Sequence, residues 1–146
     1  MGITSVAATT PFSYCHQERM DCFSFHALTA TAVIPLLMAF DRDMTIDEII
    51  IRTNAVPGAT STIQAQRIAS GTADTSGTAI GAEATNSGWT ADVNETVPLY
   101  SDSSDISEPR KISKGETLFL DYVEGSGTFG PFVVYVRWHT HPIGSF

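Results

Sequence analysis

Two histidines near the end of the chain have the residue types and spacing that could do chemistry. His139 and His141 flank Thr140 and precede Pro142. Side chains at positions i and i+2 of a strand point to the same face, which suits shared binding of a metal ion. A catalytic zinc site also needs a third protein ligand and a general acid or base. Zinc-dependent hydrolysis is therefore the first chemistry to consider.

The His-Thr-His-Pro sequence resembles the centre of the JAMM metalloprotease motif, in which a Ser-x-x-Asp sequence follows after a spacer. Four residues follow Pro142 in this sequence, so neither the serine nor the aspartate is present at that distance. We therefore expect no metal site and no catalytic residue here. We interpret His139 as the end of a strand that continues into a Pro-Ile-Gly tail.

The two cysteines, Cys15 and Cys22, do not complete a metal site either. With His16 and His26 they fit no standard spacing of zinc ligands. The N-terminus has no basic segment followed by a continuous apolar one, so we expect no signal peptide and, with it, reduced thiols. A disulfide between Cys15 and Cys22 stays open as the alternative.

Hydroxyl side chains are abundant, with 18 Thr and 14 Ser among 146 residues, but no pattern assembles a nucleophile. There is no Gly-x-Ser-x-Gly turn, and no glycine-rich sequence continues into Gly-Lys-Ser/Thr. We therefore expect that the protein is not an enzyme and needs no cofactor.

The charge of the chain argues against two classes of partner. The formal net charge is −8, and the 8 Lys and Arg residues are scattered singly, so they cannot supply the phosphate contacts on which nucleic-acid affinity depends. The same charge would be repelled by an anionic membrane surface. The longest apolar run, Ala32 to Phe40, is about half of the ~20 residues that span a bilayer. We expect neither a nucleic-acid nor a membrane partner.

The elements that must position these residues are predicted to be strands. No segment keeps the i, i+3, i+4, i+7 spacing of an amphipathic helix, and Thr, Ser and Gly suit strands and turns. The chain is therefore predicted to be all-β, an antiparallel, jelly-roll-like β-sandwich of seven or eight strands. Residues 1–20 are expected to form an extended N-terminal arm, and residues 21–146 the sandwich domain.

Three segments carry specific predictions. The apolar run at 33–40 is expected to be buried, and Pro35 within it indicates an edge strand, a bulge or the first residue of a strand. The strand at 44–56 should direct Met44, Ile46, Ile49 and Ile51 inward, and its loss of alternation at Asp47-Glu48 indicates a bulge. Residues 69–114 are predicted to be long loops with one or two short strands.

The last third of the chain contains the strongest strand signals. Residues 117–123 and 132–140 are rich in β-branched and aromatic side chains, and residues 124–131 contain several glycines. We expect the two strands to pair with each other in antiparallel fashion through this connection.

A few aromatic residues lie outside any predicted strand. Phe12 and Tyr14, with Pro11 beside them, are in the arm, and Phe146 is the last residue of the sequence. Apolar side chains in such places suit the filling of a pocket on a neighbouring protein. We therefore take Pro11, Phe12, Tyr14 and Phe146 as candidate partner-binding residues. The alternative is that the arm folds back on its own sandwich.

From Asp21 to Thr140 the chain resembles the jelly-roll decoration (cement) proteins that stud the capsids of tailed bacteriophages. The resemblance rests on the segments HALTATAVIPLLMAF, MTIDEIIIRTNAVPGATSTIQAQ, GTAIGAEAT, ISKGETLFLDYVE and PFVVYVRWH. It implies a homotrimer on the outer surface of the major capsid protein lattice, where arms and loops grip the shell. It also implies synthesis in the host cytoplasm and a final place on the capsid exterior.

A receptor- or glycan-binding fibre or spike domain of a virion is the alternative. Trp89, in the sequence NSGWTADVN, is its candidate residue, because an indole ring can stack on a sugar. The competing role for Trp89 is to plug one end of the sandwich.

Overall fold

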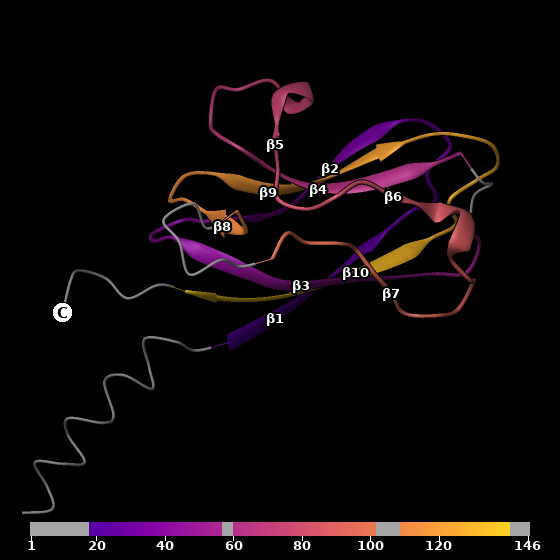
Figure 1. The fold of residues 1–146 in the computed structure, drawn as a ribbon, viewed down its shortest axis with the longest axis horizontal. Coiled ribbons are helices and arrows are strands. Elements are labelled where there is room, and N and C mark those ends of the chain that lie inside the picture. Colours follow the sequence, from indigo (N-terminus) through magenta and orange to yellow (C-terminus); the bar gives the residue numbers. More distant parts are fainter. Residues whose placement is uncertain (1–17, 57–59, 102–108, 141–146) are drawn as a thin grey trace, which may run out of the picture.

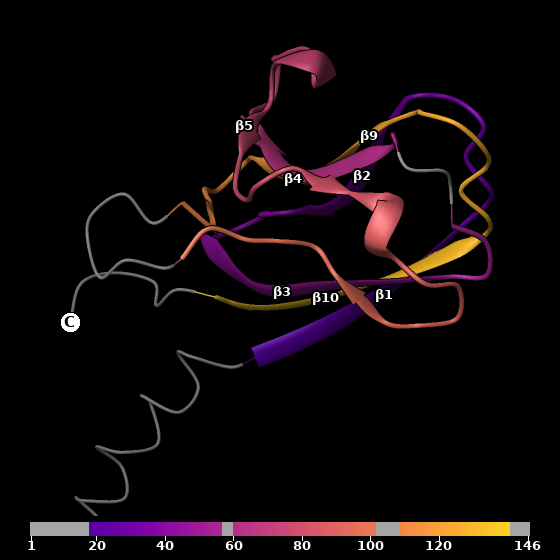
Figure 2. The same cartoon turned by 45° about the vertical axis from the view of Figure 1, so that its right-hand side comes forward.

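A computed structural model of the chain describes residues 18–56, 60–101 and 109–140. Two antiparallel sheets pack face to face (Figures 1 and 2). Two short 3-10 turns, η1 (Asp74–Ser76) and η2 (Asn86–Gly88), lie in the connections. The strands are β1 (Glu18–Phe25), β2 (Ala32–Met38), β3 (Met44–Thr53), β4 (Thr62–Ile68), β5 (Thr78–Ala79), β6 (Ala84–Thr85), β7 (Glu95–Thr96), β8 (Lys111–Ile112), β9 (Thr117–Val123) and β10 (Phe132–Thr140).

The order of the strands is that of a jelly roll. One sheet runs β1-β10-β3-β7, with β8 also on β3, and the other runs β2-β9-β4-β5, with β6 also on β4. The pairs β5/β6 and β7/β8 each lie along a single long strand and act as one interrupted strand. The sandwich thus has eight strand positions, which confirms the predicted all-β sandwich.

The prediction that the last two long strands pair with each other is wrong. β9 pairs with β2 and β4, whereas β10 pairs with β1 and β3 in the opposite sheet. The connection at 124–131 therefore crosses between the sheets instead of turning back within one. It runs beside the β1–β2 connection, where Leu28 and Phe129 exchange two backbone hydrogen bonds of 2.8 and 3.1 Å.

Two local predictions are confirmed. β2 is an edge strand, and its register with β9 breaks between Pro35 and Met38. On β3, the register with β10 passes from Glu48 opposite Arg137 to Ile46 opposite Trp138, so Asp47 is the extra residue of a bulge.

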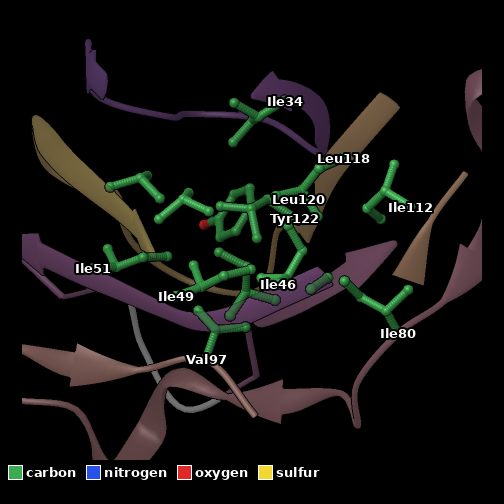
Figure 3. Packing of buried hydrophobic residues seen from close by; sticks show 14 of the residues in the cluster. Ile34, Ile46, Ile49, Ile51, Ile80, Val97, Ile112, Leu118, Leu120 and Tyr122 are labelled. Atoms are coloured by element: carbon green, nitrogen blue, oxygen red, sulfur yellow. The ribbon is translucent and has the colours of Figure 1, made fainter. Parts of the chain in front are cut away.

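The core fills the space between the two sheets (Figure 3). Met44, Ile46, Ile49 and Ile51 are buried as predicted, because the bulge at Asp47 restores the inward phase for the second half of β3. They meet apolar residues of the facing sheet, which include Ile34, Ile63, Leu118, Leu120 and Tyr122. Phe129 closes one end through edge contacts with Tyr122 and Phe132.

The boundary of the arm needs a small correction. β1 begins at Glu18, so residues 18–20, which were assigned to the arm, belong to the strand. Their addition extends β1 to the end of β10, where Glu18 lies opposite His139. No helix in the described part of the chain is both long and apolar enough to cross a membrane.

Candidate partner-binding surface

One end of the sandwich presents large apolar side chains to solvent. Met38 at the end of β2 is 52% exposed, and Phe40 in the following turn is 78% exposed. β10 ends and β1 begins at the same end, on the left in Figure 1. We use the name apolar rim for Met38, Phe40 and the hollow that lies beside these two side chains.

Backbone hydrogen bonds on both sides hold the turn that carries Phe40. The Ala39 amide donates to the Glu116 carbonyl at 2.9 Å, and the Gly115 amide donates to the Ala39 carbonyl at 2.7 Å. Gly115 makes this approach with φ of 89°, a conformation that favours glycine. With the backbone of Ala39 fixed and its side chain buried, Phe40 is displayed on a rigid support.

The Asp43 carboxylate fixes the far side of the turn. It accepts a hydrogen bond of 2.8 Å from the Lys114 amide and forms a 3.1 Å ion pair with the Lys111 ammonium group. A rigid support matters for binding, because less conformational entropy is lost when a partner covers a side chain whose backbone is already fixed.

A hollow of about 110 Å³ lies beside the exposed side chains. It is lined by Met38, Ala39, Phe40, Asp41, Arg42, Met44, Trp138 and Thr140. The hollow is too small for a drug-sized ligand but has room for one side chain of a partner. Its mixed lining, with apolar walls and Asp41 and Arg42 at the turn, is typical of a protein-docking surface.

Trp138 forms one wall of the hollow and holds two charged residues of β1. Its Nε1–H group donates to the Asp21 carboxylate at 2.7 Å, and the Arg19 guanidinium lies 5.8 Å from the centre of its ring. Both contacts are favourable for a partly exposed indole. Trp138 therefore orders the start of β1 as well as the rim.

His139 is hydrogen-bonded to a carboxylate. Its Nδ1 lies 2.9 and 3.0 Å from the two carboxylate oxygens of Asp47, the bulge residue of β3. In the described ranges, no group of three or more His, Cys, Asp or Glu residues is placed to hold a metal ion. Cys22 is an exposed free thiol on β1.

The candidate residues Pro11, Phe12, Tyr14 and Phe146 lie outside the described residues, as do Cys15 and His141. The described residues that adjoin these two segments are Glu18 and Thr140. Glu18 and His139 face each other in the register of β1 and β10, and Thr140 lines the hollow. Both segments therefore begin beside the apolar rim.

Trp89 packs into its own sandwich. Its ring makes an edge contact with Phe129 at 6.3 Å between centroids, and it is half-buried against the core. Its backbone N–H also closes η2 on the Asn86 carbonyl at 3.1 Å. These contacts favour the role of an end plug over that of a sugar-stacking platform.

Sequence reasoning missed the apolar rim. Met38 and Phe40 belong to a run that was expected to be buried, and their exposure follows from tertiary contacts of the turn. One signal was present: the polar sequence Asp41-Arg42-Asp43 marks a turn directly after Phe40, where few neighbours can cover a large side chain.

Comparison with known proteins gives no family. No family model and no curated protein matches the chain, so the resemblance to decoration proteins remains a hypothesis. Among solved structures, the chain is similar to a chain of the "Structure of infectious bursal disease virus Gx strain", with 14% sequence identity and a TM-score of 0.46. The match covers 89% of this chain and 33% of that one, so this chain spans about a third of its length.

Proposed function

We propose that the protein is a virion structural protein of the decoration (cement) type, which binds the outer surface of a major capsid protein lattice and stabilises the head. The residues that do this are those of the apolar rim, together with the segments that start beside it. The homotrimer and the capsid partner are taken from the sequence resemblance. The geometry of the apolar rim supports its use as the binding surface.

The observation that supports the proposal is the rigid display of Phe40. A 78% exposed phenylalanine on a turn held by hydrogen bonds has no role in its own core, and the adjacent hollow offers a matching recess. Full burial of such a side chain by a partner contributes about 1.5–3 kcal/mol. Many copies on one lattice would add such contacts into strong overall binding.

The proposal is tested by binding of the recombinant protein to purified capsid shells that lack it, measured by co-sedimentation. The double variant Met38→Ser with Phe40→Asp should bind at least about tenfold more weakly, since burial of two apolar side chains is lost and a charge is added. The fold should be retained, because both side chains are exposed.

Val93→Ser is the matched control. Val93 is 44% exposed but lies in a turn that hydrogen-bonds to Thr53, at the opposite end of β3 from Met44. Its replacement should leave shell binding unchanged. Equal binding by the rim variant, the control variant and the wild type would refute the assignment of the apolar rim.

A further inference from the structure

The open edge of β1 is the least protected sheet edge in the described part of the molecule. β1 has eight residues, pairs only with β10, and keeps one register along its whole length. The outermost segments β5, β6, β7 and β8 have two residues each, and β2 carries Pro35 and a register break. Short strands, proline and irregular register are the usual protections of an edge.

The backbone groups on this edge can be identified. Leu28 and Phe129 continue the register of β1 and β10 and exchange both of their backbone hydrogen bonds. Hydrogen-bonded and non-hydrogen-bonded pairs alternate along an antiparallel ladder. Met20 and Cys22 therefore bond to β10, and the N–H and C=O groups of Arg19, Asp21 and Phe23 point away from it.

We propose that β1 pairs with β1 of a second copy of this chain, antiparallel, about a two-fold axis at Met20. In this register Arg19 lies opposite Asp21 of the second copy, and the same pair repeats across the axis. Met20, which is 64% exposed, meets its own equivalent on the outer face. The proposal does not rest on the proposed function, because it is based on the edge of β1 and involves no capsid contact.

Charge decides between the possible registers. Residues that lie directly opposite each other in a sheet point to the same face. The two-fold axis must therefore pass through a residue, because an axis between two residues would pair inward-facing with outward-facing side chains. An axis at Asp21 would set two aspartates opposite each other, which destabilises a sheet. An axis at Cys22 would set Asp21 against Phe23 of the second copy and Arg19 against Phe25. Of these axes, only the one at Met20 places Arg19 opposite Asp21 of the second copy, and the two-fold symmetry forms this pair twice.

Trp138 prepares these charges for pairing. The Asp21 carboxylate is bonded to the Trp138 Nε1–H at 2.7 Å, and the Arg19 guanidinium lies over the same ring. Both side chains are therefore partly ordered before the second copy arrives, which lowers the entropic cost of association.

A disulfide cross-link tests the register in the full chain. Met20→Cys, with Cys15→Ser and Cys22→Ser, should form a disulfide-linked dimer on mild oxidation, because facing residues in a non-hydrogen-bonded pair have Cα atoms about 4.5 Å apart. Ser24→Cys in the same background is the matched control. It lies on the same face, but its equivalent would be more than about 20 Å away. Linkage of wild-type Cys22, or no more linkage at Met20→Cys than at Ser24→Cys, would overturn the proposal.

Charge reversal tests the pairing without relying on a cross-link. Arg19→Asp and Asp21→Arg, each alone, should weaken association at least about tenfold, because each places like charges opposite each other twice. An equimolar mixture of the two variants should associate as a heterodimer, since opposite charges then face each other again. Sedimentation equilibrium measures both effects. A mixture that associates no better than either variant, as expected if the protein's own arm covers β1, would contradict the proposal.

Discussion

The Tyr122 ring lies at the centre of the core and brings an ionisable hydroxyl with it. Its side chain is fully buried between the sheets, in edge contact with Phe129. Burial raises the pKa of Tyr122 above its ordinary value of 10.0, and the polar side chain of Ser61 opposes part of that rise. Folding therefore favours the neutral phenol.

This environment predicts a loss of stability at high pH. The folded-state pKa of Tyr122 is raised, so the neutral hydroxyl contributes to the free energy of unfolding. This contribution is fully present below about pH 10 and is lost as the pH rises through the folded-state pKa. The melting temperature of the wild type should fall more steeply above pH 10 than that of Tyr122→Phe, which has no hydroxyl to ionise. Equal slopes for the two proteins would show that the hydroxyl is not shielded.

Trp89 gives a second prediction at the residue scale. Trp89→Ala removes a half-buried ring and its edge contact with Phe129, so the free energy of unfolding should fall by about 2 kcal/mol. Trp89→Phe should recover most of this loss in chemical denaturation. A Trp89→Ala protein of unchanged stability that loses binding on a glycan array would instead favour the fibre or spike hypothesis.

At the scale of the elements, the alternation of side chains was sufficient to predict the long strands. The bounds of β9 and β10 agree with the predicted ranges, and the inward residues and bulge of β3 were identified from the broken phase at Asp47-Glu48. Both features are local, since they depend on which face each side chain must reach.

What could not be predicted depends on contacts between distant segments. The neighbours of β9 and β10 are determined by the topology of the whole chain. The sequences of the two strands therefore do not indicate that they lie in different sheets. The exposure of Phe40 likewise follows from bonds to Gly115 and Glu116, more than seventy positions away in the sequence. The short strands β5 to β8 have too few residues for a clear period.

Pro35 gives a prediction at this scale. Proline provides no N–H group at the edge strand β2, so Pro35→Val should restore a donor and make that edge a template for another strand. Light scattering should show faster aggregation on storage, with little change in the free energy of unfolding. Pro35→Lys restores the same donor but adds a charge and should stay dispersed. Aggregation of both variants would point to damage to the fold instead.

At the scale of the whole molecule, three features occupy different parts of the surface of the sandwich. The apolar rim is at one end, the Trp89 plug fills part of the other, and the open edge of β1 runs along one side. The capsid contact proposed for the rim and the two-fold contact proposed for β1 are adjacent, because Trp138 lines the hollow and also holds Arg19 and Asp21.

The most direct test of the proposed function is the number of copies of this protein in purified particles of the phage whose capsid it is proposed to bind, determined by quantitative mass spectrometry against the major capsid protein. A protein that binds the capsid lattice through the apolar rim should be present on the order of hundreds of copies, in a fixed ratio to the capsid subunits. About a dozen copies or fewer, as in a fibre or a vertex, would contradict the account, and so would its absence from the particle.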